Sequence, residues 1–94
     1  MGSVIRICRA AEAGTTKNDD IYVQISPCDS GIELELQSTV EELYGEQIRT
    51  TAMQYLQELG VSAVSVKLED HGALDFVIRA RLETAVRRAA GGER

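Results

Sequence analysis

Few residues of this sequence have the type and spacing that catalysis or metal binding would need. His71 is the single histidine, and it follows Glu69 and Asp70, a grouping that suggests a metal site or a general base. Either role requires further ligands, or a nucleophile, at a recognised spacing. None stands near His71 in the sequence, so we interpret it as a turn residue.

The two cysteines, Cys8 and Cys28, are too few for a disulfide scaffold and predict free thiols. Cys28 falls in a turn, where its thiol could be exposed, but no basic residue beside it would activate it. Cys8 falls in a short β-branched run, so we expect it to be a buried strand residue.

Four arginines, Arg79, Arg81, Arg87 and Arg88, fall in one segment near the end of the sequence. We interpret them as a solvated helix face whose last two members complement the helix dipole; the alternative is a phosphate contact, which guanidinium geometry suits. No glycine-rich phosphate loop, Ser-His-Asp set or metal-ligand cluster is recognisable. The residues alone therefore predict no catalytic and no metal-binding residue.

The composition indicates one small globular domain. The 94 residues carry a net charge of −5 and 44% apolar residues, enough for a core. Mixed acidic and basic residues disfavour nucleic acid and anionic membranes as partners. The N-terminus lacks the apolar stretch of a signal peptide. We expect a single domain over residues 1–94, with a frayed tail at residues 91–94, in the cytoplasm.

Hydrophobic periodicity gives the element order β-β-β-α-β-α. Residues 4–9 predict a first strand and residues 10–20 a loop. Alternation in residues 21–25 and 32–36 predicts a hairpin, and residues 63–69 alternate again. Apolar residues recur at helical spacing in two segments, one before residues 63–69 and one after them, and Gly60 ends the first of these predicted helices. Their members are Val40, Leu43, Tyr44, Ile48, Ala52, Tyr55, Leu56 and Leu59, then Leu74, Val77, Ile78, Leu82, Ala85, Val86 and Ala89.

Each predicted strand has one apolar face and each helix one apolar stripe. An α+β fold would bury them all, with a four-stranded, mostly antiparallel sheet and two helices packed on one of its faces. The other sheet face then carries polar residues: Tyr22, Gln24, Glu33, Glu35, Ser65 and Lys67.

Three segments resemble the acyl carrier (gamma) subunit of citrate lyase. Residues 70–81 (DHGALDFVIRAR) are similar to its C-terminal signature, in which Gly-Ala-Leu and an acidic residue precede an Ala-Arg pair. Residues 44–48 (YGEQI) resemble its aromatic-Gly-acidic-Gln-Ile segment. Residues 13–15 (AGT) followed by Asp20-Ile21 resemble its N-terminal loop. Order and spacing agree over roughly residues 4–90.

The resemblance implies a carrier that catalyses nothing alone. In that family a loop serine holds a phosphoribosyl-dephospho-coenzyme A arm, whose thiol carries an acetyl group between a transferase and a lyase subunit. Aligned without gaps, the family's Glu-Ser-polar-Asp run falls on residues 17–20, so Asn18 occupies the serine position. Asn18 offers no hydroxyl for the phosphodiester, and Thr16 is the possible substitute, with Thr15 beside it.

Three functions remain open at this point. The chain could be a carrier modified at Thr16, in contact with lyase and acyl-transferase subunits. It could be an unmodified assembly subunit that keeps the carrier fold and has no prosthetic group. It could also resemble the related malonate decarboxylase carrier, although the Gly-Ala-Leu-Asp block at residues 72–75 fits citrate lyase better.

Overall fold

The computed structural model describes residues 5–38 and 41–90, without the side chains of residues 41–43. The elements are β1 (Ala11–Gly14), β2 (Ile21–Ser26), β3 (Gly31–Ser38), α1 (Glu41–Leu59), β4 (Ala63–Asp70) and α2 (Asp75–Ala89). This order and the α+β class confirm the prediction. The expected frayed tail at residues 91–94 lies outside the described residues.

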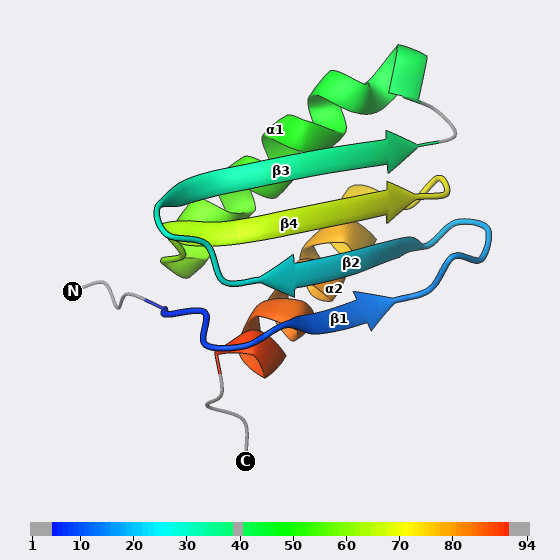
Figure 1. Cartoon of the computed structure of the whole chain (residues 1–94). Helices are drawn as coiled ribbons and strands as arrows, with labels where there is room; N and C mark the ends of the chain where they lie inside the picture. Colours follow the sequence, from blue (N-terminus) through cyan, green and yellow to red (C-terminus); the bar gives the residue numbers. More distant parts are fainter. Residues whose placement is uncertain (1–4, 39–40, 91–94) are drawn as a thin grey trace.

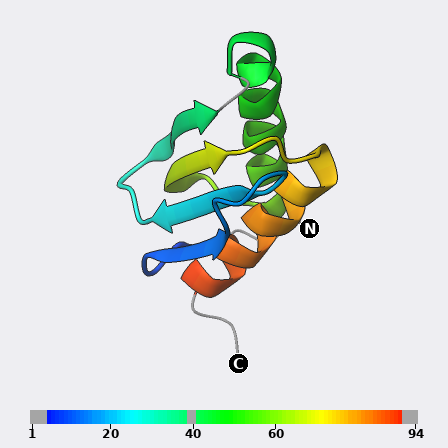
Figure 2. The same ribbon diagram turned by 90° about the vertical axis from the view of Figure 1, so that its right-hand side faces the viewer.

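The four strands form one sheet in the order β1-β2-β4-β3. β1 pairs with β2 and β2 with β4 in antiparallel fashion, whereas β3 pairs with β4 in parallel. Both helices cover the same face of this sheet, as Figures 1 and 2 show. The predicted mostly antiparallel sheet with two helices on one face is therefore confirmed.

The predicted hairpin between the second and third strands is wrong. β4 lies between β2 and β3; it pairs with β3 along its whole length and with β2 over residues 65–70. The 19-residue helix α1 connects β3 to β4, and a helical crossover of this kind joins parallel neighbours. Alternation had predicted the buried face of each strand correctly, but it does not determine which strands are neighbours.

The first strand also differs from its prediction. Of residues 5–9, Ile5 forms a single bridge to Val61, and the amides of Cys8 and Arg9 donate to the carbonyl oxygen of Ala89. Cys8 is exposed, not buried as expected. The strand that joins the sheet is β1, inside the predicted loop, because pairing with β2 overrides the weak strand propensity of Ala-Glu-Ala-Gly.

The inward residues of the strands pack against the helices. Val23, Val64 and Val66 are at most 1% exposed, and the polar residues expected on the other sheet face are exposed or half-buried there. Gly60 follows α1 with a φ of +88°, as its predicted place past the helix end requires. Within the described residues, no helix has both the length and the apolar content to cross a bilayer.

The helical stripes are confirmed in their central parts and wrong at their first residues. Ala52, Leu56 and Leu82 are fully buried. Tyr44 and Leu74, which the periodicity placed on the core side, are exposed. The predicted members Val40 and Leu43 lie outside the described side chains. The N-terminal ends of both helices therefore leave apolar surface uncovered.

Candidate functional site

The loop of residues 15–20 connects β1 to β2, and it contains the position at which the sequence predicts attachment. Thr16, Lys17, Asn18 and Asp19 are exposed, with Asn18 in the turn itself. At the start of the loop Gly14 has a φ of +92°, and a Cβ there would lie 1.9 Å from the carbonyl oxygen of Ile21. Only glycine fits this close approach, which brings the two ends of the loop together.

Asp20 anchors the loop from inside. Its carboxylate accepts hydrogen bonds from Arg81 Nε (3.0 Å) and Nη2 (2.9 Å). The Thr15 hydroxyl (2.6 Å) and the Ile21 amide (2.7 Å) also donate to it. The bidentate Arg81 bond is the main cause that lowers the pKa of Asp20 from 3.8 to about 2, against the opposing effect of burial. Asp20 is therefore ionised at neutral pH and serves as a structural anchor.

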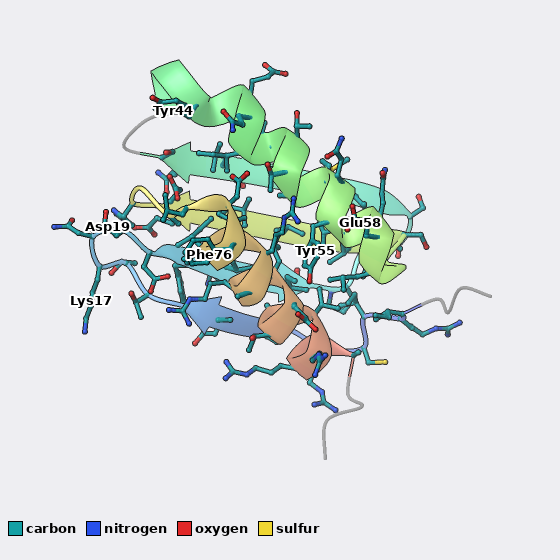
Figure 3. The ribbon with its side chains drawn as sticks, turned by 180° about the vertical axis from the view of Figure 1, so that it is seen from behind. Lys17, Asp19, Tyr44, Tyr55, Glu58 and Phe76 are labelled. Atoms are coloured by element: carbon teal, nitrogen blue, oxygen red, sulfur yellow. The ribbon has the colours of Figure 1, made fainter. Side chains whose placement is uncertain are left out.

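The turn between β4 and α2 provides a second anchor. The Asp19 amide donates to the carbonyl oxygen of His71 (2.8 Å), and the His71 amide donates to that of Asp20 (2.9 Å). Asp19 itself adopts a left-handed φ of +65°. Figure 3 shows Lys17 and Asp19 together at the end of the molecule where this turn lies. The loop thus has a fixed base and a solvent-facing tip.

The two threonines of the loop differ in availability. Thr15 is half-buried, since its hydroxyl donates to Asp20 and accepts from the Lys17 amide at 3.2 Å. Thr16 is exposed beside it. The structure therefore presents Thr16 and the amide of Asn18 to solvent and engages Thr15 in the base of the loop.

The side chains of the other candidate residues contact neighbours of their own. His71 Nε2 is 2.9 Å from Glu69 Oε2, and both side chains are partly exposed. Cys28 is half-buried, with its thiol 3.5 Å from the carbonyl oxygen of Ser30. Among the residues with described side chains, no three histidine, cysteine or acidic residues lie close enough to hold a metal ion.

The arginines of α2 contact the protein itself. Arg79 lies 5.9 Å from the centre of the Tyr55 ring, Arg87 pairs with Glu83 at 2.6 Å, and Arg88 donates to the Glu12 carbonyl oxygen at 2.8 Å. These three fit the predicted surface role rather than a phosphate site.

Arg81 holds the base of the loop, a role that the sequence analysis did not predict because it places this residue on the solvated helix face. It pairs with Asp20 across 61 residues of sequence. A signal was present: Arg81 lies three residues after Ile78 and four before Ala85, both buried. A charged residue on the apolar face of a helix indicates a partner of opposite charge in the layer against which the helix packs.

Comparison with known proteins identifies relatives over almost the whole chain. The family model described as malonate decarboxylase delta subunit (MdcD) matches residues 8–89. The citrate lyase acyl carrier protein of Halothermothrix orenii is 39% identical over 88 residues, covering 94% of each chain. The protein of the same name from Escherichia fergusonii is 45% identical, covering 92% of this chain and 90% of the relative. That from Serratia proteamaculans is 46% identical, covering 90% and 84%.

A solved structure shares the fold. It is a chain in the crystal structure of a Pseudomonas malonate decarboxylase hetero-tetramer in complex with malonate, with a TM-score of 0.78. The match covers 95% of this chain and 92% of that one, at 19% sequence identity. At that identity the likeness concerns the arrangement of strands and helices alone.

Proposed function

Because this chain belongs to the family of citrate lyase acyl carrier proteins, we propose that it is the non-catalytic carrier subunit of a cytoplasmic citrate lyase-type complex. It acts as one domain whose partners are lyase and acyl-transferase subunits. The observation that carries this proposal is the loop of residues 15–20, which has a rigid base and an exposed tip.

The site suits a group that must be reached by more than one enzyme. An exposed tip admits the active site of a modifying enzyme, and the anchored base keeps the tip in one orientation. The group that the family resemblance implies is a phosphoribosyl-dephospho-coenzyme A-type arm, whose thiol carries the acyl group. The chain's own part is to present a hydroxyl for the phosphodiester.

Asn18 bears no hydroxyl and therefore no arm. Thr16 is the exposed hydroxyl of the loop and lies two residues away. Extended residues span about 3.3–3.6 Å each, so the attachment point moves by several ångströms. The amide at position 18 also favours a second candidate function, an unmodified subunit that holds the lyase and transferase together.

Mass spectrometry distinguishes the two functions. Wild type, Thr16→Ala and Asn18→Ser are each co-expressed with the modifying transferase of a citrate lyase system, and intact and peptide masses are measured. A mass gain that maps to Thr16 and disappears in Thr16→Ala supports the modified carrier. An unchanged wild-type mass supports the assembly role.

The Asn18→Ser variant tests whether the loop still presents the family's attachment position. We expect it to gain the arm, because residue 18 is exposed in the turn and the base of the loop is intact. A variant that is folded but gains no mass would contradict the carrier geometry. A gain mapped to Asn18 in wild type would contradict the chemistry.

A further inference from the structure

The most exposed apolar side chains of the protein gather in one groove. Among the described side chains, the large hydrophobic residues that stand exposed are Tyr44 (51%), Leu74 (62%) and Phe76 (69%). All three line a groove of about 570 Å³. Single exposed apolar residues are ordinary on protein surfaces, but a cluster of this kind marks a site of interaction.

The groove lies between the N-terminal parts of the two helices. Tyr44 and Ile48 of α1 line one side, and Phe76 and Ile78 of α2 line the other. Leu74, which precedes α2, contributes from the turn. Figures 1 and 2 show that the first turns of α1 lie beyond the β3 edge of the sheet, so the sheet does not cover this end of the helix. Two of its walls are helical, which suits a preformed site.

The groove borders the loop of residues 15–20. Gly72 lines the groove, and a Cβ built on it would lie 3.7 Å from Asp19 Oδ1. The adjacent His71 carbonyl oxygen accepts the Asp19 amide hydrogen. Figure 3 shows Asp19, Phe76 and Tyr44 toward the same end of the molecule. A protein that binds the loop on the side of Asp19 therefore also comes close to the groove.

The charges of the groove indicate what kind of surface fits it. Asp70 is buried, and its carboxylate accepts hydrogen bonds from Ser38 and from the amides of Gly72 and Ala73. Asp75 also lines the groove and is exposed. An apolar groove with one exposed carboxylate in its lining, on a chain of net charge −5, is complementary to an apolar side chain flanked by arginine or lysine.

We propose that this groove is the docking site for the lyase-complex subunit that acts at the loop tip, and that this subunit inserts an apolar side chain flanked by basic residues. The inference rests on the proposed function, because it takes the occupant to be the protein that visits the loop. Docking beside the loop orients the tip toward the visiting active site. Phe76 and Leu74 are the expected anchors, since aromatic and large apolar side chains dominate binding at interface centres.

Binding measurements on full-length variants test the docking site. The probes are the purified lyase and acyl-transferase subunits of a citrate lyase lacking its own carrier, and the readout is the Kd by titration calorimetry. We expect Leu74→Ser and Phe76→Ser to weaken binding to one of these subunits by about tenfold or more. Asp75→Lys should weaken it as well, and more at low salt than at high salt. Lys67→Ser, on the open sheet face, is the control and should bind as wild type does.

The outcomes separate this inference from the proposed function. Groove variants that melt like wild type and bind with wild-type Kd would overturn the docking site and leave the carrier function standing. Equal weakening by Lys67→Ser would overturn it too. A wild-type dimer in sedimentation that Phe76→Ser dissociates, with subunit affinity unchanged, would assign the groove to a second copy and overturn the inference. Wild type that binds neither subunit would overturn both proposals.

Discussion

Replacing Asp20 with asparagine should destabilise the protein in a way that depends on pH. The substitution keeps the size of the side chain but removes its charge. It also replaces one carboxylate oxygen with an NH₂ group, which then faces hydrogen-bond donors. One of the two oxygens that now accept from Arg81 and Thr15 becomes a donor. Both the ion pair and at least one hydrogen bond at the base of the loop are lost.

The size of the effect follows from the pKa of Asp20. Its fall from 3.8 to about 2 corresponds to roughly 2.4 kcal/mol of preferential stabilisation of the charged form. The Asp20 side chain is 12% exposed but its partner Arg81 is 41% exposed, so solvent screens part of the interaction. We therefore expect Asp20→Asn to lower the free energy of unfolding by about 1–2 kcal/mol at pH 7.

The sign of the pH dependence is fixed by the lowered pKa. Between pH 3.8 and about 2 the unfolded chain binds more protons at this group than the folded chain. The stabilisation is therefore full at a pH above the pKa of the unfolded state, and it is lost as the pH falls through the pKa of the folded state. Linkage predicts that about half of it remains at pH 3. The difference in the free energy of unfolding between wild type and Asp20→Asn should therefore be smaller at pH 3 than at pH 7.

Urea denaturation at pH 7, 4 and 3 measures this difference. The control is Asp29→Asn, an exposed carboxylate in the turn before β3, which should change stability by less than about 0.5 kcal/mol. If Asp20→Asn costs no more than Asp29→Asn at pH 7, the ion pair contributes nothing and the reasoning is refuted. A difference that is the same at pH 7 and pH 3 would show that shape rather than charge is responsible.

Two further variants test the packing that positions the site. Leu56→Ala should lower the free energy of unfolding by about 2–5 kcal/mol, because the side chain is fully buried between helix and sheet; a loss below about 1 kcal/mol in a urea melt would show that the helix faces are misassigned. Gly14→Ala should cost about 1–3 kcal/mol and loosen the 15–20 loop, since its φ is +92° and its Cβ would collide with the Ile21 carbonyl oxygen. Hydrogen exchange of the loop amides would report the loosening, and unchanged exchange would contradict it.

Much of the fold followed from periodicity, which reports local burial. Val23, Val66 and Leu68 alternate with polar neighbours, and each is buried in the sheet. The order of strands did not follow, because β2, β3 and β4 have the same kind of alternation and each could neighbour another. Only the structure separates the strands by burial: Ile32 and Leu34 of β3 are half-buried at the sheet edge, while Val64 and Val66 of the central strand β4 are buried.

The exposure of the candidate loop was predictable, but the contacts that hold it were not. Asn18, which the family resemblance predicts as the attachment position, is exposed, and exposure at a loop tip is common. The Asp20–Arg81 pair did not follow, since it depends on how α2 lies across β1 and β2. The exposed Tyr44 and Leu74 were predicted as core residues because helical spacing cannot tell where a helix extends past the sheet that covers it.

The Asp20–Arg81 pair also has a consequence for the order of events during synthesis. The ribosome delivers the N-terminal residues first, so the loop segment emerges well before the residue that anchors it, 61 positions later. On a nascent chain the segment has neither Arg81 nor the His71 backbone to hold it. The shaped loop tip therefore exists only on chains that have been synthesised past Arg81. An enzyme that recognised this shape would distinguish such chains from shorter ones without any separate signal.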